Sequence, residues 1–300
     1  MGSSYGSMTN TYFKLGDYSK ALEYGTKALG AFRKNEMVNF EARVLALIAD
    51  IYMLLGDYTK MSEYMEEAKI ILKDFNEPFL LGKLEFMRSR YSLQKNDFES
   101  ALEYIDNCID LFEMSEQKHF IIAAYIEKQL ILIANGNEDK AKRLISKIEM
   151  IINKIDNPPN RPIINIIKLY LEKKNIEEEF DLNNISGDFE KDIQLSFWFT
   201  AKYFSLNDQI DEAKKFQEKA IEIINKSAKK ISGEKEREIF TKNEYFNKLT
   251  QEDFADKKEK LEEIPAENDS PAVFAFCPSC GFKNENNFAF CPSCGNDLKQ

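Results

Sequence analysis

The sequence predicts an all-α protein, a solenoid of antiparallel helix pairs, followed by a small metal-binding module. Three observations lead to this fold class. A segment of the chain recurs at a spacing of forty residues. The composition favours helices, because the 300 residues include only 12 glycines and 8 prolines and are rich in Lys, Glu, Leu, Ile and Ala. Near its C-terminal end the chain carries two Cys-x-x-Cys pairs.

The forty-residue repeat is clearest at a short turn motif. Leu-Gly-Asp-Tyr occupies residues 15–18 and again 55–58, Lys-Asn-Asp-Phe occupies 95–98, and the more divergent Asn-Gly-Asn-Glu occupies 135–138. Four copies in one register indicate a repeat architecture rather than a chance pattern in a helix-rich composition. We therefore predict four repeated units in residues 1–155.

Each unit is predicted to be two helices joined at this motif. The Gly or Asn suits the left-handed conformation that ends a first helix, and Asp17, Asp57 and Asp97 can each cap the second helix. Small or slender residues recur seven positions apart in the second helices, at Ala21 and Ala28, Met61 and Ala68, and Ala101 and Cys108. Seven residues are two helical turns, so each pair lies on one face, where a neighbouring helix can approach closely. Stacked units then bury a core that one helix pair cannot bury alone.

Several aromatic and sulfur side chains are expected to serve packing. Tyr24, Tyr64 and Tyr104 occupy equivalent positions, and we expect them to fill the gap to the next unit. Cys108 takes the place of an alanine in the repeat, which favours a buried packing role over a reactive thiol. Trp198 is expected in the core of the last unit rather than at a binding surface.

Beyond the fourth unit the register of the repeat is lost. The prolines of residues 157–162 break any helix, so residues 156–187 are interpreted as a degenerate repeat or linker containing one short helix. Residues 188–250 are predicted to form a last repeat and a closing helix, which runs from Gly233 to about Lys248 and covers the last apolar face. Residues 251–272 are acidic and are interpreted as a flexible tether.

The repeated units resemble the tetratricopeptide repeat (TPR) family. The resemblance covers residues 5–153 and is carried by the aromatics Tyr12 and Tyr52, by the Gly-Asp-Tyr turn and by the paired small residues of the second helices. The usual unit of that family has about 34 residues. A unit of forty implies helices longer by nearly one turn, as in the repeat arrays of large bacterial regulators and signalling ATPases.

The TPR resemblance also implies a partner surface. Helical repeats of this kind bind polypeptides along a concave face lined by the first helices. The equivalent positions on that face are Asn10, Asp50, Arg90 and Leu130. These residues differ from one another, as expected where specificity rather than packing selects them, and we take Asn10, Asp50 and Arg90 as candidate partner-binding residues.

The two Cys-x-x-Cys pairs in residues 273–300 predict a structural zinc site. Cys277, Cys280, Cys291 and Cys294 supply the four thiolates of a tetrahedral site, and each pair is followed by a glycine that can complete a tight turn. Four sulfurs close the coordination shell, which argues against a catalytic zinc. Two disulfides are the alternative, disfavoured because the chain shows no secretory signal. The motif resembles the zinc-ribbon family, over residues 276–298.

Nucleic-acid binding by the zinc module is a further alternative. The phenylalanines at 282, 288 and 290 can stack on bases, but a module this small needs them for its own core. Only Lys283 and Lys299 add positive charge there, and the formal net charge of the whole chain is −10. A chain with this charge is a poor binder of polyanions.

Composition and motifs argue against several other functions. The chain has one histidine, and no phosphate-binding loop or nucleophile elbow is present. No apolar run reaches the eighteen or more residues of a membrane span. We therefore expect a cytoplasmic, non-enzymatic scaffold that binds protein partners. The alternative is that the chain is the regulatory or sensor tail, or a fragment, of a larger signalling ATPase or nucleotide cyclase.

Overall fold

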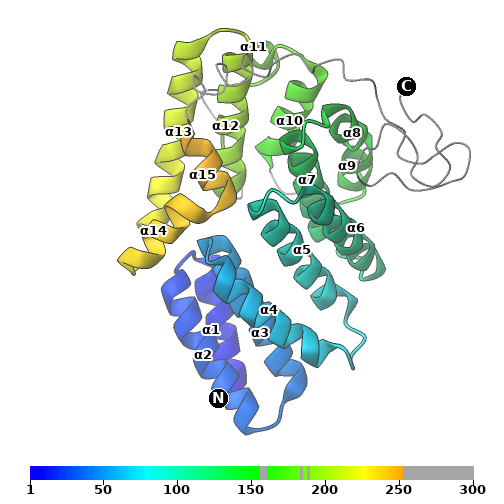
Figure 1. The fold of residues 1–300 in the computed structure, drawn as a ribbon, viewed down its shortest axis with the longest axis vertical. Helices are drawn as coiled ribbons and strands as arrows, with labels where there is room; N and C mark the ends of the chain where they lie inside the picture. The colour runs from blue at the N-terminus through cyan, green and yellow to red at the C-terminus, as the bar shows by residue number, and fades with distance from the viewer. Residues whose placement is uncertain (156–160, 183–184, 188–189, 253–300) are drawn as a thin grey trace, which may run out of the picture. The chain divides into compact units, whose positions relative to one another are not determined.

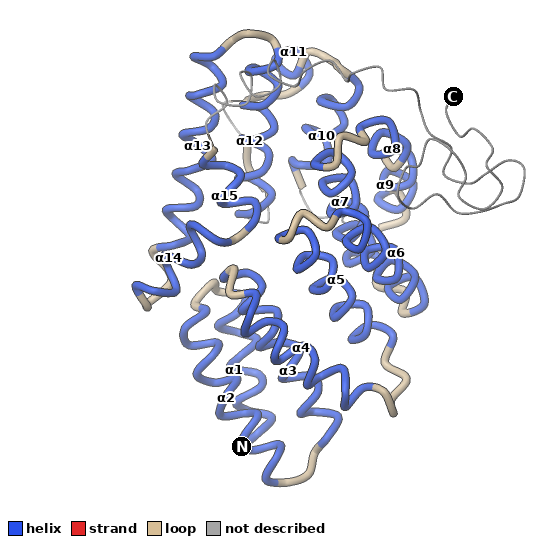
Figure 2. The backbone as a smooth tube through the Cα atoms, viewed as in Figure 1, coloured by secondary structure: helices blue, strands red, loops and turns tan. Residues whose placement is uncertain are grey.

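A computed structural model describes residues 1–155, 161–182, 185–187 and 190–252, and the described residues form fifteen α-helices and no strand. The chain divides into two compact units, Met1–Glu252 and Asp253–Gln300. Only the first unit lies within the described residues. Its helices are joined by short loops (Figures 1 and 2).

The first four units are antiparallel helix pairs, as the forty-residue repeat predicts. The pairs are α1 (Gly2–Lys14) with α2 (Tyr18–Lys34), α3 (Val38–Leu55) with α4 (Tyr58–Leu72), α5 (Pro78–Gln94) with α6 (Phe98–Met114), and α7 (Lys118–Ala134) with α8 (Glu138–Arg143) and α9 (Ile145–Ile152). The second helix of the fourth unit is therefore divided in two near Leu144. Each second helix packs against its own first helix, and α2, α4 and α6 also pack against the first helix that follows.

The turn motif has the backbone conformation that the sequence predicts. Gly16, Gly56, Asn96 and Gly136 have φ values of 75°, 76°, 57° and 70°. The carboxylates of the three aspartates at 17, 57 and 97 accept hydrogen bonds from the backbone N–H groups three residues later, at 3.1, 3.2 and 3.1 Å. The left-handed turn and the capped second helix are therefore confirmed in the first three units.

The small-residue face of the second helices is also confirmed. All six residues predicted for it have side chains with no exposed surface: Ala21, Ala28, Met61, Ala68, Ala101 and Cys108. Trp198 is 7% exposed, in agreement with a core position. A branched side chain in place of any of these alanines would have no free volume to occupy.

The position predicted for the repeated tyrosines is wrong. Tyr24 stacks on Tyr12 with ring centroids 5.4 Å apart, and Tyr64 stacks on Tyr52 at 5.6 Å. Tyr104 lies beneath the guanidinium of Arg88, 4.1 Å from the ring centroid. Each tyrosine therefore joins the two helices of its own unit instead of filling the gap to the next. The reason is the turn, which places the C-terminal part of the first helix opposite the second helix.

After the fourth unit the chain forms one partial unit and one complete pair, followed by two closing helices. Helix α10 (Pro162–Glu172) is followed by the short α11 (Ile176–Glu179), and α12 (Glu190–Leu206) pairs with α13 (Ile210–Ala228). The single short helix expected in the degenerate unit is α10, and α11 is a second helix in a part of that unit that the sequence did not predict to be helical. Helix α10 packs against α12 and α8, and so bridges the fourth unit and the last pair. Arg161 fixes the start of α10 by a bidentate contact with Asp192 at 2.6 and 3.0 Å.

The closing helix differs from the prediction in two ways. It is two helices, α14 (Glu234–Asn243) and α15 (Tyr245–Gln251), separated by an extended residue, Glu244, with φ −60° and ψ 126°. It also does not cover the last pair alone. Phe240 packs on a cluster that includes Ala21 and Leu55, from the first and second units.

Other contacts join the end of this unit to its beginning. The backbone N–H of Ser232 donates to the Ser19 hydroxyl at 3.2 Å, and that of Tyr245 donates to the Tyr58 hydroxyl at 3.3 Å. Gly56 lies so close to α15 that a Cβ atom there would come within 2.6 Å of the backbone nitrogen of Glu244. In Figure 1, α15 lies between the α12–α13 pair and α5.

Replacing Ala21 or Ala101 by Leu should overpack the close helix contacts and lower the free energy of unfolding by about 1–3 kcal/mol. Gly30, in the interior of α2, is the matched control, because a Cβ there would meet no atom within 4 Å. Gly30→Ala should stabilise the chain by about 0.5–1 kcal/mol. Urea denaturation midpoints measure all three. An Ala21→Leu or Ala101→Leu chain with an unchanged midpoint would contradict the close packing.

Candidate functional site

The candidate partner surface is the first-helix face, defined by two sets of equivalent positions on the first helices of the four units. One set is Ser3, Arg43, Lys83 and Ala123, and the other is Asn10, Asp50, Arg90 and Leu130. On α3 the positions Arg43, Leu47, Asp50 and Leu54 are more exposed than their neighbours, which shows that this side of the helix is turned away from the second helices.

Ion pairs connect successive first helices across this face. Lys83 on α5 contacts Asp50 on α3 at 2.5 Å, and Arg90 on α5 contacts Glu127 on α7 at 2.5 Å. Arg43 on α3 contacts Glu77, the residue before α5, at 2.8 Å. The charged residues of the first-helix face therefore bind one another in the free chain, and they fix the distance between neighbouring units.

The structure places the three candidate partner residues in different surroundings. The side chain of Asn10 is exposed. The Asp50 carboxylate is 14% exposed and is held by Lys83. Arg90 is also 14% exposed and is enclosed by two carboxylates, and Leu130 is 4% exposed. The expectation that Arg90 is an accessible surface residue is therefore wrong, because α15 and the residue before it cover this part of the face.

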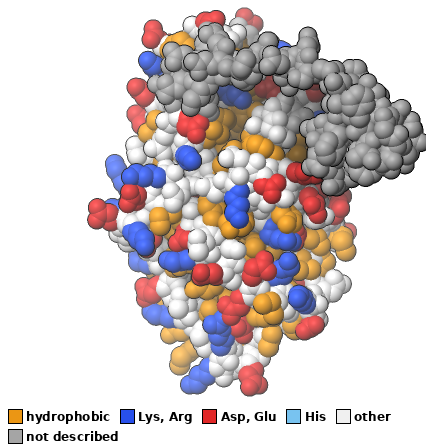
Figure 3. Space-filling view, in the orientation of Figure 1, with side chains coloured by type: hydrophobic (Ala, Val, Ile, Leu, Met, Phe, Trp, Pro, Cys, Tyr) orange, Lys and Arg blue, Asp and Glu red, His pale blue; other side chains and the backbone are white. Residues whose placement is uncertain are grey.

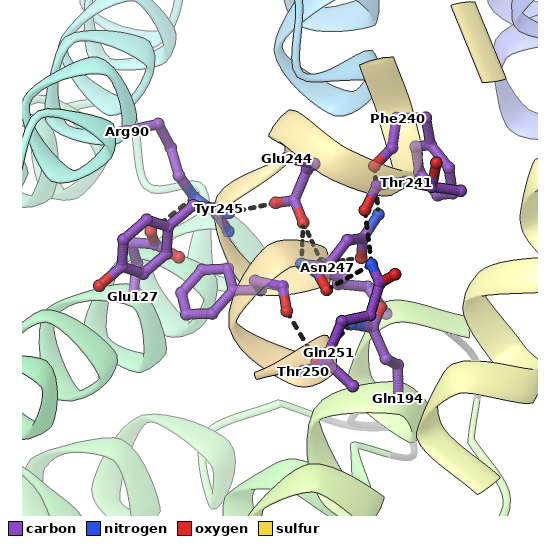
Figure 4. Close-up of polar contacts among 12 residues, drawn as sticks. Arg90, Glu127, Gln194, Phe240, Thr241, Glu244, Tyr245, Asn247, Thr250 and Gln251 are labelled. Carbon is purple, nitrogen blue, oxygen red and sulfur yellow. Dashed lines mark hydrogen bonds and ion pairs between the residues drawn. The ribbon is translucent and has the colours of Figure 1, made fainter. Parts of the chain in front are cut away.

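Arg90 belongs to a four-charge cluster with Glu127, Lys191 and Glu244. Figure 4 shows the Arg90 guanidinium between the carboxylates of Glu127 and Glu244. Besides its contact with Glu127, its Nη1 lies 3.3 Å from Oε1 of Glu244. Lys191 Nζ lies 2.7 Å from the other oxygen of the Glu244 carboxylate, Oε2. The cluster brings together α5, α7, α12 and the break before α15, and its two positive and two negative charges balance.

The same part of the chain adds an aromatic ring and a helix cap. Phe246, which is 2% exposed, lies under both cations of the cluster, with the Arg90 guanidinium carbon 4.7 Å and Lys191 Nζ 5.4 Å from the ring centroid. Such cation–π contacts gain strength when they are desolvated. The Glu244 carboxylate also accepts the backbone N–H of Asn247 at 2.8 Å and so caps α15.

Burial shifts the ionisation of two members of the cluster in opposite directions. Desolvation raises the pKa of the Glu127 carboxyl, and the positive charge of Arg90 opposes that rise. Desolvation lowers the pKa of the Lys191 ammonium group, although 32% of the side chain remains exposed, and Glu244 opposes that change. Each charge is thus kept by its partners, which makes the loss of one partner costly.

Helix α15 is also bound through its backbone by side-chain amides. Gln217 on α13 donates to the carbonyl oxygens of Thr250 and Glu252 at 2.9 and 2.8 Å. Gln194 on α12 donates to the side-chain hydroxyl of Thr250 at 3.2 Å. Within the closing segment, Asn247 of α15 donates to the carbonyl oxygen of Phe240 in α14 at 2.9 Å. The array therefore contacts α15 through charge, through an aromatic ring and through its main chain.

Sequence reasoning missed Glu127, Lys191 and Glu244. Glu127 stands with Lys128 and Gln129 in the middle of an otherwise apolar stretch of α7, from Phe120 to Ala134, which is the one signal that could have singled it out. Lys191 and Glu244 stand in strongly charged surroundings in the sequence, where an exposed residue is the ordinary expectation. Their partners come from distant repeats, and local patterns do not report such contacts.

The other residues singled out in the sequence, His119 and Cys108, lie outside the charged cluster. His119 is exposed, and burial raises the pKa of the Cys108 thiol.

The four zinc-module cysteines, 277, 280, 291 and 294, lie outside the described residues. Within residues 1–252, the described His, Cys, Asp and Glu side chains form no group placed to hold a metal ion. None of the helices described there is long and apolar enough to cross a membrane. Acidic and basic side chains are interspersed on the face shown in Figure 3.

Glu127→Gln should lower the free energy of unfolding by about 3–5 kcal/mol, because it leaves two cations with one carboxylate in a desolvated cluster. Glu103→Gln, on the exposed side of α6, is the matched control and should change stability by no more than about 0.5 kcal/mol. The double variant Arg90→Met/Glu127→Gln should recover part of the loss, because the charges balance again. Urea denaturation measures the free energy of unfolding of each variant. Equal midpoints for Glu127→Gln and Glu103→Gln would contradict the stabilising role of the cluster.

Comparison with known proteins agrees with the fold. A family model described as a tetratricopeptide repeat matches residues 42–69, which lie within α3 and α4. Among curated proteins, none matches this chain in sequence. A Rap protein complexed with competence and sporulation factor is a similar solved structure, with a TM-score of 0.61 at 15% identity. The match covers 74% of this chain and 63% of the Rap chain, so this chain spans less than two thirds of that protein.

Two further solved structures show a weaker likeness. BtubC (BKLC) from P. vanneervenii has 15% identity and a TM-score of 0.44, with 74% of this chain and 78% of that chain covered. A Podosopora anserina putative kinesin light chain with nearly identical TPR-like repeats has 14% identity and a TM-score of 0.41, with 75% and 95% covered. The family match at residues 42–69 and the likeness to the Rap structure agree with the tetratricopeptide-like helical array that the described residues form.

Proposed function

We propose that this chain is a non-enzymatic interaction scaffold that binds a polypeptide partner on its first-helix face. The observation that carries the proposal is the contrast between two kinds of equivalent position. The packing positions of the second helices carry Ala, Met and Ala at 21, 61 and 101, all without exposed surface. The exposed positions of the first-helix face carry unlike residues, Ser3 and Arg43 at one equivalent position and Asn10 at the other. The packing positions of the second helices carry similar residues, whereas the positions on the first-helix face carry different ones. This contrast is what we expect of a surface that distinguishes between partners.

The part of this face on α1 and α3 suits a partner best. Asn10 is exposed, and Arg43 is 58% exposed although it contacts Glu77. Arg90 is covered by α15, which leaves the first two units as the accessible region of the face. Ion pairs between exposed side chains contribute little to stability, so a partner can exchange them at small cost.

For the C-terminal segment we propose one structural zinc ion bound by Cys277, Cys280, Cys291 and Cys294. The support is the chemistry of the donor set, because four thiolates in two Cys-x-x-Cys pairs match the tetrahedral preference of zinc. Bound zinc would hold these four cysteines together in a segment too short to fold on a large core.

A photo-crosslinking amino acid placed at Asn10 should join the chain covalently to a polypeptide in the native cell. The same group at Thr26, which is exposed on the second helix α2, is the matched control and should give no such product. Arg43→Glu should reduce the yield at Asn10, with a stability change of no more than about 1 kcal/mol, as for an exposed ion pair. Mass spectrometry identifies the product. Equal yields at both positions, or a product that is RNA or DNA, would contradict the proposed surface.

Metal analysis of the gently purified chain should give about one zinc ion per chain. Cys280→Ser should lose the metal with nearly unchanged helicity by circular dichroism. Cys108→Ser is the matched control for the loss of one thiol, since Cys108 lies in the core of α6, and that variant should keep its zinc. A chain that retains zinc after replacement of both Cys280 and Cys294 would refute the metal site.

A further inference from the structure

We propose that Arg90 and Lys191 form a binding site for an acidic and aromatic peptide segment, and that Glu244 and Phe246 of this chain are its displaceable resident occupant. The segment recognised would carry a carboxylate followed two residues later by a phenylalanine. This inference rests on the proposed function, because it adds to the scaffold a second site, made by Arg90 of the first-helix face and Lys191 of α12, and names the class of partner that it binds.

The two helices that carry the cations each pack on helices other than α15. Arg90 is on α5, which packs against α6, and Lys191 is on α12, which packs against α13. Glu127 on α7 holds the Arg90 guanidinium at 2.5 Å independently of α15. Departure of α15 would therefore leave two cations, Arg90 and Lys191, with one carboxylate of the cluster, Glu127. Such a site favours an incoming anion, because a buried excess charge is costly until it is paired.

The occupant side consists of one short continuous segment. Glu244 supplies the carboxylate, Phe246 supplies the ring under both cations, and the carbonyl oxygens of Thr250 and Glu252 accept from Gln217. All of these groups lie within nine residues of chain. A linear peptide can present the same groups in the same order, which is how an amphipathic helix in a groove is usually recognised.

The attachment of this segment to the array suits displacement. Helix α14, which leads into it, has no buried residue. The compact unit ends at Glu252, one residue after α15. A tethered occupant has an effective concentration of about millimolar order, so a partner in solution competes only when it binds more tightly or when the resident segment is weakened.

The test uses the full chain and a fluorescent synthetic peptide with the sequence of residues 240–252. Glu244→Gln in the chain weakens the resident segment by removing its carboxylate. Glu238→Gln is the matched control, because Glu238 is 61% exposed on α14 and contacts only Lys242 among the ion pairs of the described residues. We expect the peptide to bind the Glu244→Gln chain at least tenfold more tightly than the natural or Glu238→Gln chain. A peptide with Gln in place of the glutamate that corresponds to Glu244 should lose at least tenfold in affinity for the same variant.

Hydrogen exchange on the same samples separates the outcomes. Loss of protection confined to α14 and α15 in Glu244→Gln, together with peptide binding, supports the inference. If α15 stays protected in that variant, Phe246→Ala is added to release it. The inference is overturned, and α15 is a structural cap, if the peptide binds neither the Glu244→Gln chain nor the Glu244→Gln/Phe246→Ala chain. Loss of protection throughout α5 and α7 overturns it as well. A partner crosslinked at Asn10 while α15 stays protected would support the proposed function and overturn this inference alone.

Discussion

The structure depends on the close approach of helices at the small residues of the second helices. With alanines of no exposed surface at 21, 28 and 101, each second helix can pack on its own first helix and, in the first three units, on the next one along the chain. Repetition of this contact sets the direction in which successive units are added. After the fourth unit and α10, that direction brings the α12–α13 pair and α15 to the first three units, so the charged cluster and the Tyr58–Tyr245 hydrogen bond follow from packing that is purely steric.

Charge has a different task in this array. The Arg90–Glu127 ion pair adds little net stability, because the cost of desolvating the two charges offsets their attraction. Apolar residues of similar volume often stabilise a core equally well. What the ion pairs supply is selection among arrangements, because a first helix displaced by one turn would leave its charge without a partner. The pairs Asp50–Lys83, Arg90–Glu127 and Arg161–Asp192 each join different helices on the inner side of successive units. They act as alignment contacts along an array whose apolar packing alone would tolerate small shifts.

The sequence contained most of the local structure and little of the long-range structure. Left-handed turns, aspartate caps and small-residue faces are decided within a few residues, and each could be predicted from a motif in residues 15–28 and its copies. The contact between Arg90 and Glu244 joins residues 154 positions apart, and the sequence around neither residue predicts it. For the same reason the surface exposure expected of Arg90 was predicted wrongly. The destination of the repeated tyrosines was wrong for a local reason, because the turn places them opposite the first helix of their own unit.

The contact of Gly56 with the backbone of Glu244 has a consequence for how this protein can change in length. In an open helical array, one unit can be inserted or lost at modest cost, because each unit meets only its neighbours. Here the turn of the second unit and a side chain of the third meet the same short C-terminal segment. A further unit inserted between the third unit and α12 would move the segment around Glu244 away from Gly56 and Arg90 by the full length of one unit. The number of repeats is therefore tied to the ends of the array, and duplication of a unit, the ordinary route by which repeat proteins lengthen, is closed to this one.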